Sequence, residues 1–167
     1  IDINLDIKDS HCEDAVNFVN TKGNITKVKI FNSKFDGMDI DFSELEIDNA
    51  TVYYSYNDCI DLSSGKYIIN SVALNTCEDK GISAGEKTSL YIENIKVENS
   101  KIGLAVKDSS NVIVKNYDSS NLEKCAMIYR KKKEFVGGML SITNKDCDNS
   151  QFYVQENSVL KLYETSN

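Results

Sequence analysis

The sequence contains no proline and no tryptophan, and only 8 glycines and one histidine among its 167 residues. This scarcity excludes a collagen-like repeat and a flexible linker, which depend on glycine and proline. No apolar run approaches the length of a bilayer-spanning helix, so we expect no membrane insertion. With 41% hydrophobic and 27% charged residues, the chain can bury a core, and we expect a single domain over residues 1–167. Because it starts at Ile1 without a signal peptide, we expect a segment excised from a longer protein.

The balance of charge and the cysteines restrict the partners further. The net charge of −7 argues against nucleic acid or an anionic membrane surface as the main partner. The cysteines are odd in number, none forms a Cys-x-x-Cys pair, and the single histidine is adjacent to one of them, so neither a disulfide framework nor a zinc site is indicated. We interpret most of them as small apolar core residues. They are Cys12, Cys59, Cys77, Cys125 and Cys147.

The strongest signal is an internal repeat. A short sequence motif recurs, consisting of a small residue, an apolar residue, any residue and a further residue that is usually apolar. Further segments alternate apolar and polar residues and end in asparagine, as in Leu90-x-Ile92-x-Asn94, which is typical of short strands. The motif begins at Ala15, Gly37, Cys59, Gly81, Gly103 and Ala126, in steps of 22, 22, 22, 22 and 23 residues.

A unit of this length with about three short strands cannot enclose a core alone, but stacked units can, because each strand then pairs with its copy in the next unit. The sequence therefore predicts an all-β fold, a parallel β-helix with about seven coils of ~22 residues. The recurring asparagines predict an internal amide ladder. Residues 130–138 form a longer insertion, and insertions of this kind map to loops that often belong to a binding face.

The repeats resemble the single-stranded, right-handed parallel β-helix of the pectin-lyase-like superfamily over essentially the whole chain. The resemblance is carried by the segments Asp58–Gly65, Lys80–Gly85 and Ile102–Lys107. It implies a bacterial, secreted or cell-envelope module, of the kind found beside CotH-kinase-like domains. It implies no particular activity, because this fold carries many functions.

The same segments are similar to glycoside hydrolases of the polygalacturonase type, with Asp36 and Asp58 at positions where that family keeps carboxylates. The other positions differ. Asn57 stands where a carboxylate is expected, Lys80 where a histidine is expected, and Ala105 where an arginine is expected. Inverting hydrolysis needs an acid and a base on either side of a water, so we do not expect this activity.

Four aspartates fall on two adjacent coils when the repeat is stacked: Asp36, Asp39, Asp58 and Asp61. Like carboxylates at coil spacing repel one another, so this cluster predicts a Ca²⁺ site. Lys80 lies one coil beyond it, and with a lowered pKa it could remove the C5 proton of a metal-bound uronate. Calcium-dependent polysaccharide lyases of this fold use a similar arrangement. The alternatives are a calcium site without chemistry, and aspartates that are solvated or cap backbone amides at the turns.

A basic column lies toward the other end of the chain. It predicts a site for a polyanionic sugar chain, with an aromatic ring that stacks on it. The alternative is a solvated loop that protects the edge of the solenoid. Tyr53, Tyr54 and Tyr56 would form a second sugar platform if their rings are exposed. The predicted substrate-binding residues are Lys107, Tyr129, Arg130, Lys131, Lys132 and Lys133.

Three functions remain open. The favoured one is a non-catalytic module of an exported or cell-envelope protein that presents a surface to a polysaccharide or to a neighbouring domain. The first alternative is a calcium-dependent polyuronate lyase with Lys80 as its base, and the second is a structural spacer. The non-catalytic module is favoured because only residues 130–138 form a long loop, whereas enzymes of this fold usually wall a groove with several.

Overall fold

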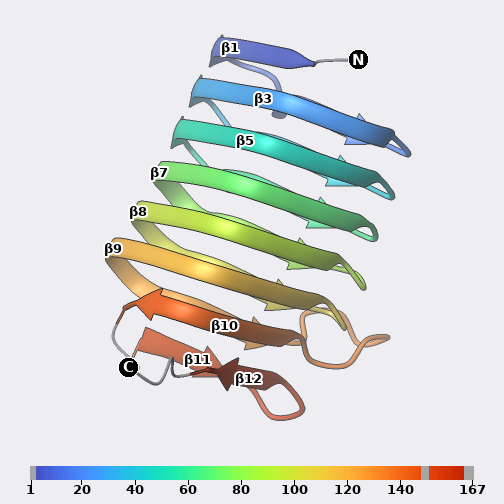
Figure 1. The fold of residues 1–167 in the computed structure, drawn as a ribbon, viewed down its shortest axis with the longest axis vertical. Coiled ribbons are helices and arrows are strands. Elements are labelled where there is room, and N and C mark those ends of the chain that lie inside the picture. Colours follow the sequence, from blue (N-terminus) through green and yellow to red (C-terminus); the bar gives the residue numbers. More distant parts are fainter. Residues whose placement is uncertain (1–2, 148–150, 164–167) are drawn as a thin grey trace.

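The computed structural model describes residues 3–147 and 151–163, and these form a parallel β-helix of about seven turns (Figure 1). The predicted fold is therefore confirmed. No helix long and apolar enough to cross a membrane occurs in the described part of the chain. The strands are β1 (Asn4–Ser10), β2 (Asp14–Val19), β3 (Lys22–Ser33), β4 (Asp36–Asp41), β5 (Glu44–Ser55), β6 (Ile60–Ser63), β7 (Lys66–Gly85), β8 (Ser89–Lys107), β9 (Asn111–Tyr129), β10 (Met139–Asp146), β11 (Phe152–Val154) and β12 (Val159–Leu162).

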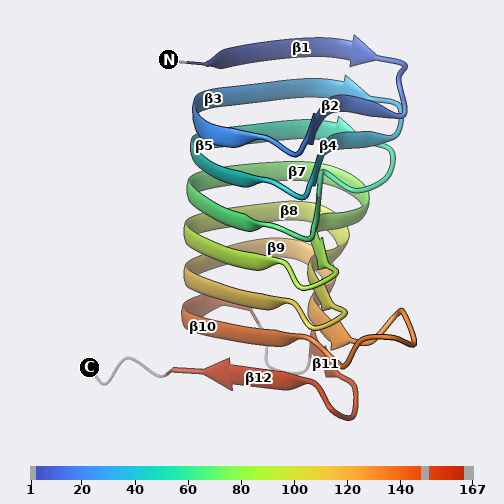
Figure 2. The same ribbon diagram turned by 90° about the vertical axis from the view of Figure 1, so that its right-hand side faces the viewer.

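The strands stack in sequence order along the axis of the solenoid. The long strands follow the order β1-β3-β5-β7-β8-β9-β10-β12, while β2, β4 and β6 form a second, shorter path that joins β7 (Figure 2). All pairings are parallel, and Ile25 pairs with Ile47, which pairs with Ile69. These partners are one repeat apart, so the 22-residue period of the sequence is the length of one coil.

Each coil has three sides because the inward positions change phase along it. In β5, Leu45 and Ile47 point inward, and the next buried pair is Ala50 and Val52. The chain turns between the two pairs. A second corner follows at Tyr54, whose positive φ of 60° falls in the left-handed region. The same corner recurs on other coils, at Asp9, Asn32, Thr76, Asn99 and Asn121.

The structure corrects the start of the sixth repeat. Leu104 pairs with Ala126, so Cys125, and not Ala126, takes the place of Gly103. The step is therefore 22 residues here as well. The reason is burial: Ala126 and Ile128 are fully buried, whereas Met127 lies partly exposed between them. Cys59 occupies the same position in the repeat, one coil after Gly37 and one coil before Gly81.

The amide ladder exists but lies outside the core, contrary to the prediction. Asn116 donates from Nδ2 to Asn94 Oδ1 at 2.9 Å, and Asn144 donates to Asn116 Oδ1 at 2.7 Å. These side chains are exposed or half-buried on an outer corner. The interior is filled with apolar residues instead, which need no hydrogen-bond partners.

Cys59, Cys77 and Cys125 are buried in the core as expected, but four of the five cysteines form disulfides, which the sequence did not indicate. Cys59 is bonded to Cys77 and Cys125 to Cys147, with Cα–Cα distances of 5.4 and 6.5 Å. Cys12 is exposed and has no disulfide partner. In each bridge the first cysteine stands at the position that starts a repeat, where other coils have glycine. The second cysteine follows 18 or 22 residues later, so each bridge links neighbouring coils.

Candidate functional site

The predicted aspartates, Lys80 and Lys107 lie on one side of the solenoid, which we call the polar face. It is built by β2, β4, β6 and the C-terminal ends of β7, β8 and β9, which pair in parallel register. Because side chains alternate along a strand, outward positions of successive coils form rows that run parallel to the axis. The residues of a row therefore come from points 22 residues apart in the chain.

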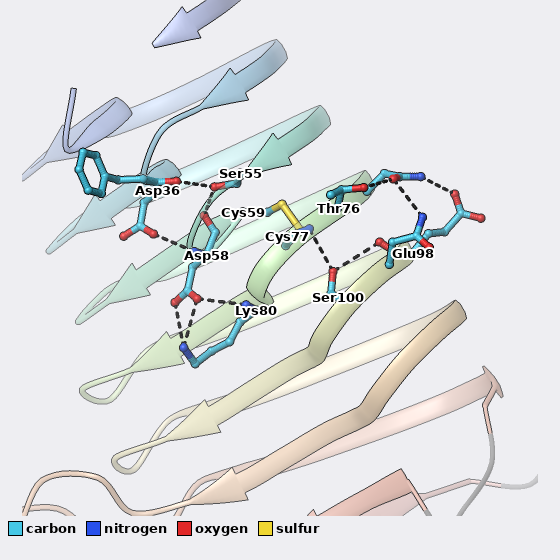
Figure 3. Close-up of a disulfide and its surroundings, with 12 residues drawn as sticks. Asp36, Ser55, Asp58, Cys59, Thr76, Cys77, Lys80, Glu98 and Ser100 are labelled. Atoms are coloured by element: carbon cyan, nitrogen blue, oxygen red, sulfur yellow. Dashed lines mark hydrogen bonds and ion pairs between the residues drawn. A yellow bond between two sulfur atoms is a disulfide. The ribbon is translucent and has the colours of Figure 1, made fainter. Parts of the chain in front are cut away.

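The first row links three coils through side chain to backbone hydrogen bonds. Asp36 Oδ1 accepts from the Asp58 backbone N–H at 2.8 Å and from Asn57 Nδ2 at 2.7 Å. Asp58 Oδ1 accepts in turn from the Lys80 backbone N–H at 3.2 Å (Figure 3). The expectation that aspartates cap backbone amides is confirmed for these two residues. Asn57, which stands where a hydrolase carboxylate was expected, holds Asp36 in place.

Lys80 does not have the lowered pKa that a general base needs. Its ammonium lies 3.1 Å from Asp58 Oδ1 and also pairs with Asp79. Burial acts to lower the pKa of Lys80, but the two carboxylates outweigh it and raise the pKa to about 12. Burial raises the pKa of Asp58, and the Lys80 ammonium partly offsets this effect. At neutral pH Lys80 is thus a protonated, paired side chain.

The second row holds Asn17, Asp39, Asp61 and Ser83 in direct register. Asp39 accepts from Asn17 Nδ2 at 3.3 Å. Burial, followed by the charges of neighbouring aspartates, raises the pKa of Asp39 to about 7. One carboxylate oxygen of Asp61, Oδ1, is buried and has no hydrogen-bond partner. The acidic residues therefore share a face as predicted, and this row leaves hydrogen-bonding capacity unused.

The calcium prediction has no direct support in this geometry. Within residues 3–147 and 151–163, no group of three or more Asp, Glu, His or Cys side chains is arranged to hold a metal ion. Asp36 and Asp58 each use a carboxylate oxygen to accept a hydrogen bond from a backbone N–H, and Asp58 also pairs with the Lys80 ammonium. The carboxylates are thus distributed along two rows, and the Ca²⁺ site stays a prediction.

Lys107 reaches this second row from one coil further along. The side chain is only 8% exposed, and its ammonium lies 2.6 Å from Ser83 Oγ. Its stem passes over Gly85, where an added Cβ would lie 2.8 Å from Lys107 Cε. A glycine at this position therefore leaves the space that the lysine occupies. The sequence identified Lys107 as a site residue but did not reveal that it is buried or that it contacts Ser83.

Residues 130–138 form the loop between β9 and β10, which we call the basic loop, and it is attached to the polar face mainly through its backbone. Asp108 Oδ1 accepts from the backbone N–H groups of Lys131 and Lys132 at 2.7 and 2.8 Å, and the Lys132 ammonium pairs with Glu86. Tyr129, and not Arg130, is in register with Lys107 and is half-buried. Arg130, Lys131, Lys132 and Lys133 are exposed on the loop beyond it.

An exposed group of aromatic rings lies where the chain enters the polar face, and we call it the aromatic corner. Tyr56 is 66% exposed and precedes Asp58 by two residues, and Phe35 directly precedes Asp36. Sequence reasoning found the tyrosines but missed both phenylalanines, although Phe31 lies one repeat before Tyr53 and pairs with it. The aromatic corner comprises Phe31, Phe35, Tyr53, Tyr54 and Tyr56.

The polar face and the aromatic corner are therefore continuous: apolar rings stand beside rows of carboxylates, an amide, a hydroxyl and two ammonium groups. Such a surface can stack against apolar ring faces and exchange hydrogen bonds with hydroxyl groups. Comparison with known proteins adds no relative to this description, because no protein family, no curated protein and no solved structure matches the chain.

Proposed function

We propose that this protein is a non-catalytic β-helix module that binds a polysaccharide along its polar face and aromatic corner. The observation that carries the proposal is the position of the exposed rings of Phe35 and Tyr56 at the head of the aspartate rows. A group of exposed aromatic rings that is rimmed by polar residues is typical of a ligand-binding surface. Sugar rings have apolar C–H faces that stack on aromatic side chains, and hydroxyl rims that carboxylates bind.

The arrangement of the rows also suits a polymer. Parallel coils repeat at about 4.8 Å, so equivalent side chains recur at short, regular intervals along the axis. A chain of similar sugar units can use the same contacts on several coils, whereas a small molecule would use only one. The two disulfides favour an oxidising location, which supports assignment of the module to an exported or cell-envelope protein.

The lyase alternative is weaker, because its base would be Lys80. A lysine that is held protonated by Asp58 and Asp79 cannot remove a proton from a sugar at neutral pH. A purely structural spacer would not need exposed rings next to partly buried carboxylates. We therefore regard binding as the primary function and treat the other two as outcomes of its test.

The test is affinity electrophoresis of the wild-type protein in gels that contain cellulose derivatives, xylan, mannan, chitosan or polygalacturonate, each with Ca²⁺ or with a chelator. We expect at least one polymer to retard the protein. The variants Phe35→Ala and Tyr56→Ala should weaken that retardation at least tenfold in apparent Kd, because each loses a stacked ring. Tyr91→Ala removes a partly exposed ring from another side of the solenoid and serves as the matched control.

The other functions predict different outcomes. Retardation by no polymer would contradict the proposal and leave the spacer. Equal binding by Tyr56→Ala and wild type would move the site away from the aromatic corner. If polygalacturonate is cleaved, with the ultraviolet absorbance of an unsaturated product that disappears in Lys80→Ala, the lyase is correct and the module is not non-catalytic.

A further inference from the structure

We infer that Lys107 and Asp61 select a neutral, hydroxyl-bearing sugar over a uronate at the centre of the polar face. The inference rests on the proposed polysaccharide function, and it adds the chemical class of the ligand and the two residues that determine it. It depends on the unused hydrogen-bonding capacity of two partly or fully buried groups. Lys107 and Asp61 belong to coils two steps apart, and the Lys107 ammonium reaches Ser83 on the coil between them.

Lys107 is an under-used donor. An ammonium group can donate three hydrogen bonds, but in the described part of the chain this one makes a single bond, to the neutral Ser83 hydroxyl at 2.6 Å. Lys107 is 8% exposed, and among residues 3–147 and 151–163 no carboxylate lies within ion-pair distance of its ammonium, so its charge has little compensation from this part of the protein. The space for its stem depends on Gly85, which has no side chain. The fold therefore brings this charge to Ser83.

Asp61 is the matching acceptor. It pairs in register with Ser83, the residue that holds the Lys107 ammonium, so the two charged groups lie on neighbouring rungs of the same face. Its Oδ1 is buried without a partner, which carries a desolvation cost unless a ligand or a rotation of the carboxylate satisfies it. A donor that approaches Asp61 from the surface would relieve that cost.

Only a group that both donates and accepts can serve both residues. A sugar hydroxyl accepts from the Lys107 ammonium and donates to the Asp61 carboxylate, and two adjacent hydroxyls can serve one residue each. A uronate carboxylate could accept from Lys107 but would lie against Asp61 and the neighbouring Asp39 and Asp58. Lys80 cannot balance those charges, because Asp58 and Asp79 already pair with it. Repulsion therefore disfavours an acidic sugar here.

The experiment is calorimetric titration of the wild-type protein with cellohexaose, xylohexaose, mannohexaose and hexagalacturonate at low ionic strength. We expect at least one neutral hexasaccharide to bind at least tenfold more tightly than hexagalacturonate. Lys107→Met and Asp61→Asn should each weaken the neutral ligand about tenfold, which corresponds to about 1.4 kcal/mol. Asp61→Asn should also strengthen hexagalacturonate, because a repelling charge is removed, and a merely structural role for Asp61 would not produce this reversal.

Lys115→Met and Asp118→Asn are the matched controls, since both residues are exposed on the long strand β9, away from the polar face, and should leave all affinities unchanged. Thermal unfolding of every variant identifies any that fails to fold, and Asp61→Asn then tests the inference without Lys107→Met. Tighter binding of hexagalacturonate than of any neutral probe would overturn the inference while leaving polysaccharide binding intact. Unchanged affinities in both variants would also overturn it. Binding of none of the probes would remove the proposed function together with the inference.

Discussion

At the scale of single residues, the polar face combines groups with full hydrogen bonding and groups without it. Asp36 and Asp58 each accept hydrogen bonds from the next coil, and these bonds hold the coils in register. Asp39 and Asp61 lie beside them with fewer partners, and Asp61 has a buried oxygen with none. Coil register and the proposed binding would therefore depend on different aspartates, and substitutions can separate the two.

Asp58 is the residue whose loss should cost the most stability on this face. Its side chain is 5% exposed, and Asp58→Ala would remove the acceptor of the Lys80 backbone N–H together with one partner of its ammonium. We expect a loss of about 2 kcal/mol in the free energy of unfolding, measured with urea. Glu44→Ala breaks the solvent-exposed pair with Lys22 and should leave the free energy of unfolding almost unchanged. Equal losses would show that Asp58 is not a structural link.

Asp39 should make stability depend on pH in the neutral range. Its pKa rises from 3.8 to about 7 on folding, so between these values the folded protein binds the proton more tightly than the unfolded chain. The protein should therefore become more stable as the pH falls from about 8 to about 5, because protonation favours the folded state. Thermal unfolding across this range measures the effect.

Asp39→Asn should flatten the dependence of Tm on pH, although Asp36 and Asp41, whose pKa values are also raised by burial, will keep part of it. The exposed Asp118→Asn is the control and should retain the wild-type slope. An Asp39→Asn variant with an unchanged slope would mean that Asp39 titrates normally.

At the scale of elements, the corner before β6 is fixed by the Cys59–Cys77 bridge, which directly follows Asp58 (Figure 3). The bridge closes a loop with a sequence separation of 18 residues, so the double variant Cys59→Ser/Cys77→Ser should lose about 3 kcal/mol of unfolding free energy. Cys12→Ser, which removes the exposed unbridged thiol, should lose nothing. Alkylation of the unfolded, unreduced protein should label one cysteine, and labelling of five would contradict both bridges.

Elements also show where sequence reasoning succeeded and where it failed. The strands were predictable because glycine or cysteine recurs every 22 residues before an alternating apolar pair. The sixth start was misplaced by one residue, since both Cys125 and Ala126 are small and only burial distinguishes the two registers. The disulfides were missed because Cys59 and Cys77 occupy different positions of the repeat. They meet only where a corner of one coil lies against the next coil.

The sequence predicts which residues of the candidate site share a row, but it does not predict which side chains touch. The repeat placed Asp39 and Asp61 together, because register is a property of the backbone. It could not show that Lys107 bends back one coil to Ser83, since the path of a long side chain depends on the space that Gly85 leaves. Exposure of the rings was likewise invisible, because an aromatic residue at a strand end packs inward in some folds and outward in others.

At the scale of the whole molecule, equal coils mean that the solenoid should tolerate the removal of one complete unit. Deletion of residues 82–103 joins Gly81 to Leu104, which occupies the position that follows Gly103 in register with Ile82. The shortened protein should fold with the same circular dichroism spectrum per residue and a length reduced by about 4.8 Å in small-angle scattering.

Deletion of residues 82–92 is the control, because half a unit places inward residues on the outside of the coils that follow. This variant should fail to fold or should expose apolar surface that binds a hydrophobic dye. If both deletions behave alike, the register of the coils does not determine the fold.

The constant coil length also has a consequence for how the chain reaches its folded state. Pairing partners such as Ile25, Ile47 and Ile69 are always one coil apart, so no coil must search for a distant segment. Once two coils have formed, each further coil closes a loop of the same short length on an existing edge. Folding should therefore spread from a nucleus in either direction, and its rate should depend on the formation of the first pair of coils more than on the number of coils.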